Sequence, residues 1–152
     1  MASDEAFIRE ALHEAEKAYA LGEVPVGAVV VVDGEIVSRA HNLRETLKDA
    51  TAHAEIIALR EAARARGGWR LEDAVVYTTM EPCPMCAGAL VQFRVRKVVY
   101  GVADPKAGAA GSIVNLLQEP RFNHQVEVEA GVLEEECREI VQRFFQELRQ
   151  KG

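Results

Sequence analysis

Three things are scarce in this sequence of 152 residues: positive charge, long apolar runs and cysteine. The 18 lysines and arginines are outnumbered by 24 acidic residues, which gives a net charge of −6 and excludes a surface coated in positive charge. Any nucleic-acid contact must therefore be local. The longest apolar run, VGAVVVV, has the length of a strand and falls far short of the ~20 residues that span a bilayer. Three cysteines, and no secretory-type leader in MASDEAFIREAL, predict a reduced cytoplasmic protein.

The length and the apolar periodicity predict the organisation of the chain. A chain of this length is the size of one domain, and no repeat or linker divides it, so we expect a single domain over residues 1–152. Helical spacing predicts a helix over 4–21, and Asp33-Gly34 predicts a hairpin turn between two antiparallel strands. The buried strands AVVYTT and KVVYGV are joined through a short helix at 84–93, which favours parallel pairing and an α/β fold. A weaker helix at 113–118, a strand QVEVEAG and a final amphipathic helix from about 133 to 150 complete the order.

The segment TAHAEIIALREAARARGG begins a helix with an unusual pair of residues. Its apolar stripe and its terminal Gly67-Gly68 account for the packing and the end of the helix. Neither feature requires His53 and Glu55 at its start, so this pair needs a partner elsewhere in the chain.

The partner is the segment MEPCPMCAG, which lies between the two parallel strands. Pro84 suits the first helical position, so Cys83 falls at the N-cap and Cys86 in the first turn, with both sulfurs on one side. The helix dipole there favours thiolates. The His-bearing and Cys-bearing helices each follow a strand, so their N-termini can meet at one edge of the sheet.

Two thiolates and one imidazole, with a fourth position left for water, fit zinc best. We expect one zinc ion held by His53, Cys83 and Cys86. Residues i and i+2 of a helix normally diverge, so only a fraying first turn would let Glu55 lean over the water. In that position Glu55 would pass a proton from the water to a substrate nitrogen, the chemistry of a deamination or hydrolysis.

Other interpretations of these residues remain open at this point. Cys-x-x-Cys alone also occurs in structural zinc sites and redox pairs, and a closed site would have Glu55 on the metal and no water. Cys137 lies on the apolar stripe of the last helix and is expected to pack in the core. His124, in the loop PRFNHQVE, either faces solvent or contacts substrate.

His-Ala-Glu followed by Pro-Cys-Pro-Met-Cys is similar to the zinc deaminase signature. The resemblance to the bacterial tRNA-specific adenosine deaminases covers nearly the whole chain. It is carried by GEVPVGAVVV, AHN, TAHAEIIALR, MEPCPMCAGAL, VVYGVADPKAGAAGS, FNHQVE, GVLEEEC and FFQELR. This resemblance implies a three-layer α/β/α cytidine-deaminase-like fold, with a mixed five-stranded sheet and helices on both faces.

The resemblance also implies a role for individual residues. It assigns the zinc to His53, Cys83 and Cys86, and the proton shuttle to Glu55. The remaining residues that it implies contact the substrate: Asn42, Val26 and Ala54 around the flipped base, Asp104 and Lys106 at flanking nucleotides, and Phe145 and Arg149 on the helix that closes over the anticodon loop. Phe144 and Phe145 are adjacent, so at least one of them is expected to pack in the core. Lys106, Arg121, Arg143, Arg149 and Lys151 are the cations expected near the RNA.

The implied activity is hydrolytic deamination of adenosine to inosine at the wobble position of a tRNA anticodon, in the family most often that of an arginine tRNA. The implied partners are the anticodon stem-loop and a second copy of the chain in a homodimer. Two alternatives stay open. One is a free-base deaminase acting on guanine or cytosine, which would not need a C-terminal helix rich in aromatics and cations. The other is a zinc-stabilised RNA-binding module without turnover, which would not require Glu55.

Overall fold

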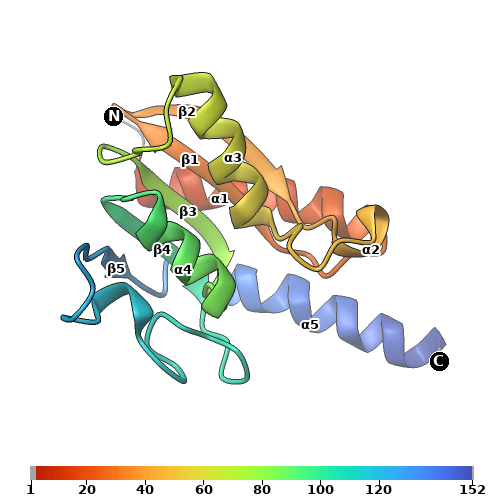
Figure 1. Ribbon diagram of the computed structural model, residues 1–152. Helices are drawn as coiled ribbons and strands as arrows, with labels where there is room; N and C mark the ends of the chain where they lie inside the picture. The colour runs from red at the N-terminus through yellow and green to blue at the C-terminus, as the bar shows by residue number, and fades with distance from the viewer. Residues whose placement is uncertain (1–2, 152) are drawn as a thin grey trace.

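The computed structural model describes residues 3–151, and Met1, Ala2 and Gly152 of the predicted 1–152 domain lie outside it. A five-stranded sheet of order β2-β1-β3-β4-β5 lies between two layers of helices (Figure 1). The helices are α1 (Asp4–Ala20), α2 (Arg44–Leu47), α3 (Ala54–Arg66), α4 (Pro84–Gln92) and α5 (Glu134–Lys151), with a 3₁₀ turn η1 (Leu116–Gln118). The strands are β1 (Gly27–Val32), β2 (Glu35–His41), β3 (Val75–Met80), β4 (Lys97–Val102) and β5 (Glu127–Glu129). The predicted three-layer α/β/α architecture is confirmed.

The sheet is mixed, as predicted, because its two halves are connected differently. β1 and β2 form an antiparallel hairpin, and both residues of its turn have positive φ: 51° at Asp33 and 78° at Gly34. That backbone suits Asp-Gly. β3 pairs with β4 in parallel, and α4 is the crossover between them, while β1 joins the two halves by pairing antiparallel with β3.

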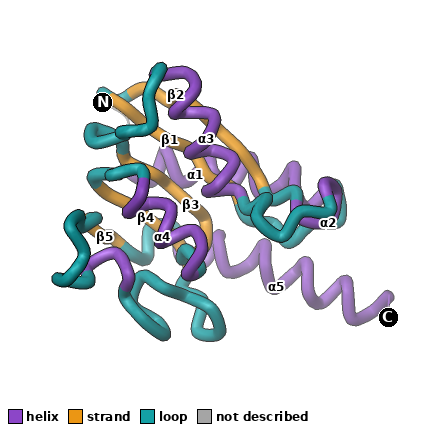
Figure 2. The backbone as a smooth tube through the Cα atoms, in the orientation of Figure 1, coloured by secondary structure: helices purple, strands orange, loops and turns teal. Residues whose placement is uncertain are grey.

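Alternate residues of the strands fill two separate cores. Val30, Val76 and Val98 face α3 and α4, whereas Val29 and Val99 face α1 and the start of α5. Both helical layers are visible in Figure 2, with α3 and α4 on the near side of the strands and α1 on the far side. The three central strands, β1, β3 and β4, are therefore buried on both faces, as expected for the centre of an α/β sheet.

The final helix packs on the sheet only along its first part. Its buried residues are Cys137, Ile140 and Phe144, and Cys137 lies in the core as predicted. The C-terminal turns of α5 project past the sheet, toward the end marked C in Figure 1. Among the residues described, no helix combines the length and the apolar character needed to cross a bilayer.

Two local predictions differ from the structure, and one short helix is not predicted. The expected helix at 113–118 is only the 3₁₀ turn 116–118, because the Gly111 N–H bonds the Val114 carbonyl and Ala110 pairs with Asn115. The expected strand 125–131 is reduced to β5, an edge strand that pairs with β4 over three residues. The short helix α2, which the sequence pattern does not predict, lies in the loop between β2 and α3.

Candidate active site

The first candidate ligand, His53, is held just outside a helix. It is the N-cap of α3, with extended backbone (φ −76°, ψ 152°), and its carbonyl accepts the first helical hydrogen bond from Ile57 N–H at 3.1 Å. Because the N-cap does not follow helical geometry, its side chain need not diverge from that of Glu55 at the second helical position. An ordinary helix start, with His53 as the N-cap, thus takes the place of the fraying first turn that the sequence predicts.

The two cysteines occupy the equivalent place on α4. Cys83 is the N-cap, with φ −75° and ψ 174°, and Pro84 is the first helical residue, as predicted. The Cys83 carbonyl accepts from Ala87 N–H at 2.8 Å, which completes the helix start. Cys86 lies in the first turn and is fully buried.

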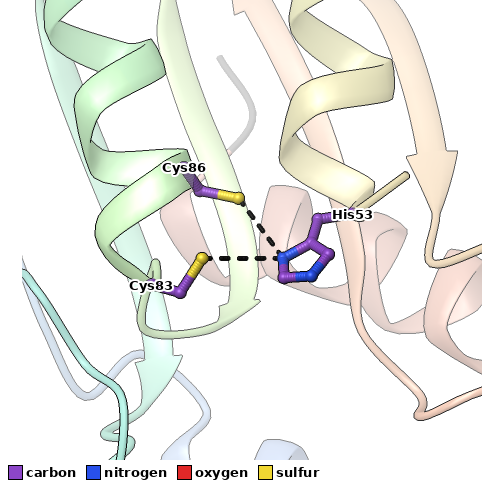
Figure 3. Close-up of side chains that lie close together, drawn as sticks. All are labelled: His53, Cys83 and Cys86. Atoms are coloured by element: carbon purple, nitrogen blue, oxygen red, sulfur yellow. Dashed lines mark hydrogen bonds between the residues drawn. The ribbon is translucent and has the colours of Figure 1, made fainter. Parts of the chain in front are cut away.

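The three side chains converge between the starts of the two helices (Figure 3). His53 Nδ1 lies 3.6 Å from each of the sulfurs of Cys83 and Cys86, and the three ligand atoms lie within 4.8 Å of one another. A tetrahedral zinc with bonds of about 2.3 Å to sulfur and 2.0 Å to nitrogen requires a sulfur–nitrogen separation of about 3.5 Å. The spacing of the ligand atoms therefore fits zinc.

The electrostatics of the cluster also favour a cation. The thiol of Cys86 and the ring of His53 hydrogen-bond Cys83, which lowers the pKa of Cys83 to about 4. The adjacent Cys83 sulfur and burial hold the pKa of Cys86 far above its ordinary value. Two neighbouring thiols ionise together only beside a positive charge, and a zinc ion supplies that charge.

Glu55 stands beside the cluster and is not part of it. Its side chain is 4 % exposed, and its carboxylate is not among the three mutually close ligand atoms. Burial raises the pKa of Glu55 to about 7. A carboxyl group with that property can both take up and release a proton near neutral pH, as a general acid–base must.

A cavity of about 220 Å³ opens beside these residues. It is lined by Val24, Val26, Asn42, Arg44, His53, Ala54, Glu55, Met80, Glu81, Cys83, Asp104 and Ala107. This volume lies below the ~300 Å³ at which pockets begin to hold drug-sized ligands, so it suits a single base. The structure brings together Val26, Asn42, Ala54 and Asp104, four of the residues predicted to contact the substrate.

Asn42 is held in place at the mouth of this cavity. Its Oδ1 accepts from Arg44 N–H at 3.0 Å, and its Nδ2 donates to the Val24 carbonyl at 3.2 Å. One amide hydrogen and one lone pair remain beyond these two bonds. The side chain is therefore orientated by the protein and still able to bond a ligand.

The other predicted contacts line a groove next to the cavity. The groove has a volume of about 840 Å³ and runs between α5 and the segment after β4. It is lined by Val24, Met80, Val102, Ala103, Asp104, Pro105, Lys106, Arg138, Val141, Gln142, Phe145, Gln146 and Arg149. Because Val24, Met80 and Asp104 line both spaces, the groove adjoins the cavity.

The structure distinguishes the two adjacent phenylalanines. Phe144 is 9 % exposed, and its ring packs edge-on against Tyr19 with centroids 5.7 Å apart. Phe145 is 38 % exposed and faces the groove. Phe144 is thus a core residue, and Phe145 is the one available to a ligand.

Some expected contacts lie elsewhere. Arg143 stacks on Tyr19 at 4.7 Å and approaches Glu16 at 3.5 Å, so it faces α1 and does not line the groove. Arg121 pairs with Glu119 in the loop before β5 and lines neither space. His124 Nε2 donates to the Val95 carbonyl at 2.8 Å, which places it just before β4, whereas Cys83 of the candidate metal cluster follows the end of β3.

Two buried carboxylates are not singled out by the sequence motifs: Glu81, which lines the cavity, and Glu23, which holds the start of α2. Glu23 is 1 % exposed and accepts from the backbone N–H groups of Glu45 and Thr46 at 3.0 and 2.6 Å. Glu81 is 3 % exposed and holds the loop after β4. Each of these glutamates lies beside a predicted strand and has no lysine or arginine within four residues of it in the sequence. This pattern indicates that backbone N–H groups donate to the carboxylate when it is buried.

Comparison with known proteins connects this geometry to a family. The model of the cytidine and deoxycytidylate deaminase zinc-binding region matches residues 1–102. The tRNA-specific adenosine deaminase of Bacillus subtilis is 59 % identical over 99 % of this chain and 94 % of its own. The chain belongs to the tRNA-specific adenosine deaminase family.

Solved structures extend the comparison to the fold. A structure from a study of A-to-I editing by tRNA:A34 deaminases at the wobble position is 45 % identical, with a TM-score of 0.85 over 88 % of this chain and 97 % of the other. A guanine deaminase of Bacillus subtilis is 33 % identical, with a TM-score of 0.66 over 83 % of each chain. The tRNA-specific adenosine deaminase family thus shares its fold with enzymes that act on a free base.

Proposed function

We propose that this protein hydrolyses adenosine to inosine at the wobble position, position 34, of a tRNA anticodon, with one zinc ion per chain and with an arginine tRNA as its substrate. The carrying observation is the adjacency of two spaces: a base-sized cavity at the His53, Cys83 and Cys86 cluster shares three lining residues with the groove lined by Phe145 and Arg149. A loop nucleotide can enter the first while its neighbours occupy the second.

In the proposed reaction each residue of the cavity has one task. Zinc, when bound by His53, Cys83 and Cys86, would act as a Lewis acid and lower the pKa of the water that it binds. Water adds to C6 of the adenine while Glu55 takes one of its protons and delivers it to N1. Glu55 then moves the remaining proton of the new C6 hydroxyl to the exocyclic amine, so that the C6–N bond breaks, ammonia leaves and the C6 carbonyl of inosine forms. Asn42 bonds the flipped nucleotide, the Ala54 backbone lies against the base, and Val26 forms a wall of the cavity.

The groove supports recognition of a folded RNA loop in spite of the acidic net charge. Phe145 offers a face on which an unstacked base can pack, and such stacking is the common mode of single-strand RNA recognition. Lys106 and Arg149 line the groove, and no ion pair within residues 3–151 engages either of them. Both cations are therefore available to phosphates, with Asp104 beside them for flanking nucleotides.

We further propose that residues 1–152 form one deaminase domain, that it acts as a homodimer and that it is cytoplasmic. The exposed apolar side chains of Ile113, Val114 and Phe122 are suited to contact with a second copy. Cys83, Cys86 and Cys137 are all free thiols, in keeping with a reducing compartment.

A free-base deaminase is the second candidate, because a guanine deaminase shares 33 % identity with this chain. The groove favours the RNA substrate, since a small base fills the cavity and gains nothing from Phe145 or Arg149.

The deciding experiment compares substrates for the zinc-loaded protein at low salt. An anticodon stem-loop with adenosine at position 34 should be converted to its inosine form, and free adenosine, guanine and cytosine should be poor substrates because they lack the loop contacts. Efficient turnover of guanine or cytosine with the stem-loop unchanged would replace the RNA assignment by the free-base one. Binding of the stem-loop without any turnover would leave only a zinc-stabilised RNA-binding module.

A further inference from the structure

Glu81 is a buried carboxylate that the proposed chemistry does not use. It stands between the end of β3 and Cys83, and its two oxygens accept four hydrogen bonds from the loop after β4. Oε1 accepts from Asp104 N–H at 3.0 Å and from the Ser112 hydroxyl. Oε2 accepts from Ala110 N–H at 3.0 Å and from Ser112 N–H at 3.1 Å. The carboxylate therefore joins both ends of the 104–112 loop.

The loop held in this way carries residues of both the cavity and the groove. Asp104, whose backbone is bonded by Glu81, uses its own Oδ1 to accept from Lys106 N–H at 3.0 Å and from Ala107 N–H at 3.2 Å. Asp104 and Ala107 line the cavity, and Asp104 and Lys106 line the groove. A chain of hydrogen bonds thus leads from Glu81 to the residues proposed to meet the RNA.

The same contacts join the loop to the segment that carries a zinc ligand. The carbonyl of Pro82, which precedes Cys83, accepts from Ala109 N–H at 2.8 Å, and Glu81 N–H donates to the Val102 carbonyl at 2.9 Å. Gly108 packs so closely that a Cβ there would lie 2.3 Å from the Glu81 carboxyl carbon. The loop and the start of α4 therefore form one tightly packed unit.

The charge of Glu81 matches this arrangement. Four donors suit the lone pairs of a carboxylate, whereas a glutamine would point an NH₂ group at N–H donors. The site is built for an ionised acid.

We propose that Glu81 is a positioning residue, whose carboxylate fixes the 104–112 loop so that Asp104 and Lys106 are already arranged for the RNA when it arrives. This inference rests on the proposed function for its substrate. Without these bonds the loop would have to be ordered on binding, and that entropy would be lost from the affinity.

The test uses zinc-loaded full-length variants and two independent readouts. Ser112→Ala removes one donor at an exposed residue, Ser112→Thr retains the hydroxyl, and Glu81→Gln disrupts the whole set. Ser38→Ala is the matched control, because the Ser38 hydroxyl donates to the Ala58 carbonyl at 2.7 Å, outside this loop. The readouts are hydrogen exchange of the Asp104 and Ala110 amides, and kcat and KM on the stem-loop, with zinc content measured alongside.

Ser112→Ala should accelerate exchange of both amides and raise KM roughly two- to tenfold, with kcat and zinc content nearly unchanged. Ser112→Thr should restore the wild-type values, Glu81→Gln should exceed Ser112→Ala in both readouts, and Ser38→Ala should move neither. Unchanged exchange and KM in Ser112→Ala, or an equal rise of KM in Ser38→Ala, would overturn the proposal. If the wild type leaves the stem-loop unedited, the proposed function fails, and the exchange measurement still decides whether Glu81 holds the loop.

Discussion

The inner end of the site, at the N-termini of α3 and α4, and its outer end, along the last turns of α5, are built in opposite ways. At the inner end His53 and Cys83 are helix N-caps, and Glu55 and Cys86 are buried in the turns that follow. At the outer end Phe145 is 38 % exposed and follows Phe144, the last buried residue of α5.

This difference reflects what each end is proposed to do. Chemistry needs ligands and a proton carrier that are already in position, because any reorganisation during the reaction adds to the barrier. Recognition of a loop needs accessible aromatic and cationic groups around which bases and phosphates can settle. Variants at the inner end should therefore affect metal and turnover, and variants at the outer end should affect binding.

The largest effect is expected from Cys86→Ala, at the inner end. Loss of one thiolate leaves an incomplete ligand set, so zinc and deamination should be lost together. Cys137→Ala is the control, because it removes another fully buried thiol from the core and should leave about one zinc per chain. Metal content by atomic emission checks both variants. Full zinc content in Cys86→Ala would remove Cys86 from the ligand set.

Glu55→Gln should reduce turnover without removing the zinc. Because Glu55 lies outside the three-ligand cluster, the variant should retain zinc and stem-loop affinity while kcat falls by ~10² to 10⁴. Glu61→Gln, at an exposed position of the same helix, should retain full activity. Single-turnover kinetics measure the rate of deamination, and metal analysis measures the zinc content. Loss of zinc from Glu55→Gln would identify a closed four-ligand site.

The same contrast explains what the sequence could predict. The inner end could be predicted from the sequence because its signals are local. Pro84 sets the start of α4, and Gly67 ends the helix that begins after His53. Helices and strands followed from apolar periodicity for the same reason. The lining of the groove depends on long-range packing, since Tyr19 on α1 decides that Phe144 is buried and leaves Phe145 exposed.

Loops were the least predictable part. The segment 113–118 has helical spacing, yet the 3₁₀ turn begins only at Leu116, because Glu81 and Asn115 hold the preceding backbone. Arg121 and Arg143 were expected near the RNA from their charge and from the family resemblance of their segments, but each pairs with a glutamate instead. The local sequence does not predict which acidic residues the fold will place beside a given lysine or arginine.

Phe145→Ala tests whether the outer end of the site contributes to binding of the stem-loop. Loss of a stacking surface should weaken stem-loop binding by roughly tenfold, with zinc unchanged and the free energy of unfolding altered by about 0.5 kcal/mol or less. Phe144→Ala should do the reverse: it should cost about 3 kcal/mol of stability and leave the affinity of the folded protein nearly intact. Fluorescence anisotropy and urea unfolding give the two quantities. Equal effects on affinity would contradict the assignment of the two rings.

Arg149→Ala should have the smallest effect. Removing one phosphate contact should weaken binding modestly and reduce the slope of log affinity against log salt by about 0.7. Arg143→Ala is the matched control on the same helix, because Arg143 faces α1, and its slope should equal that of the wild type. A lower slope in Arg143→Ala than in Arg149→Ala would show that the RNA contacts the side of α5 that faces α1 and does not contact the groove.

The most direct test of the division between the two ends is to map inosine in total bacterial tRNA after incubation with the zinc-loaded protein. Sequencing of the products locates each converted adenosine. If the groove delivers one loop nucleotide to the buried centre, inosine should appear at the wobble position of a tRNA with adenosine there, and at no other adenosine of that molecule. Inosine scattered through stems and loops, or none at all, would contradict the account.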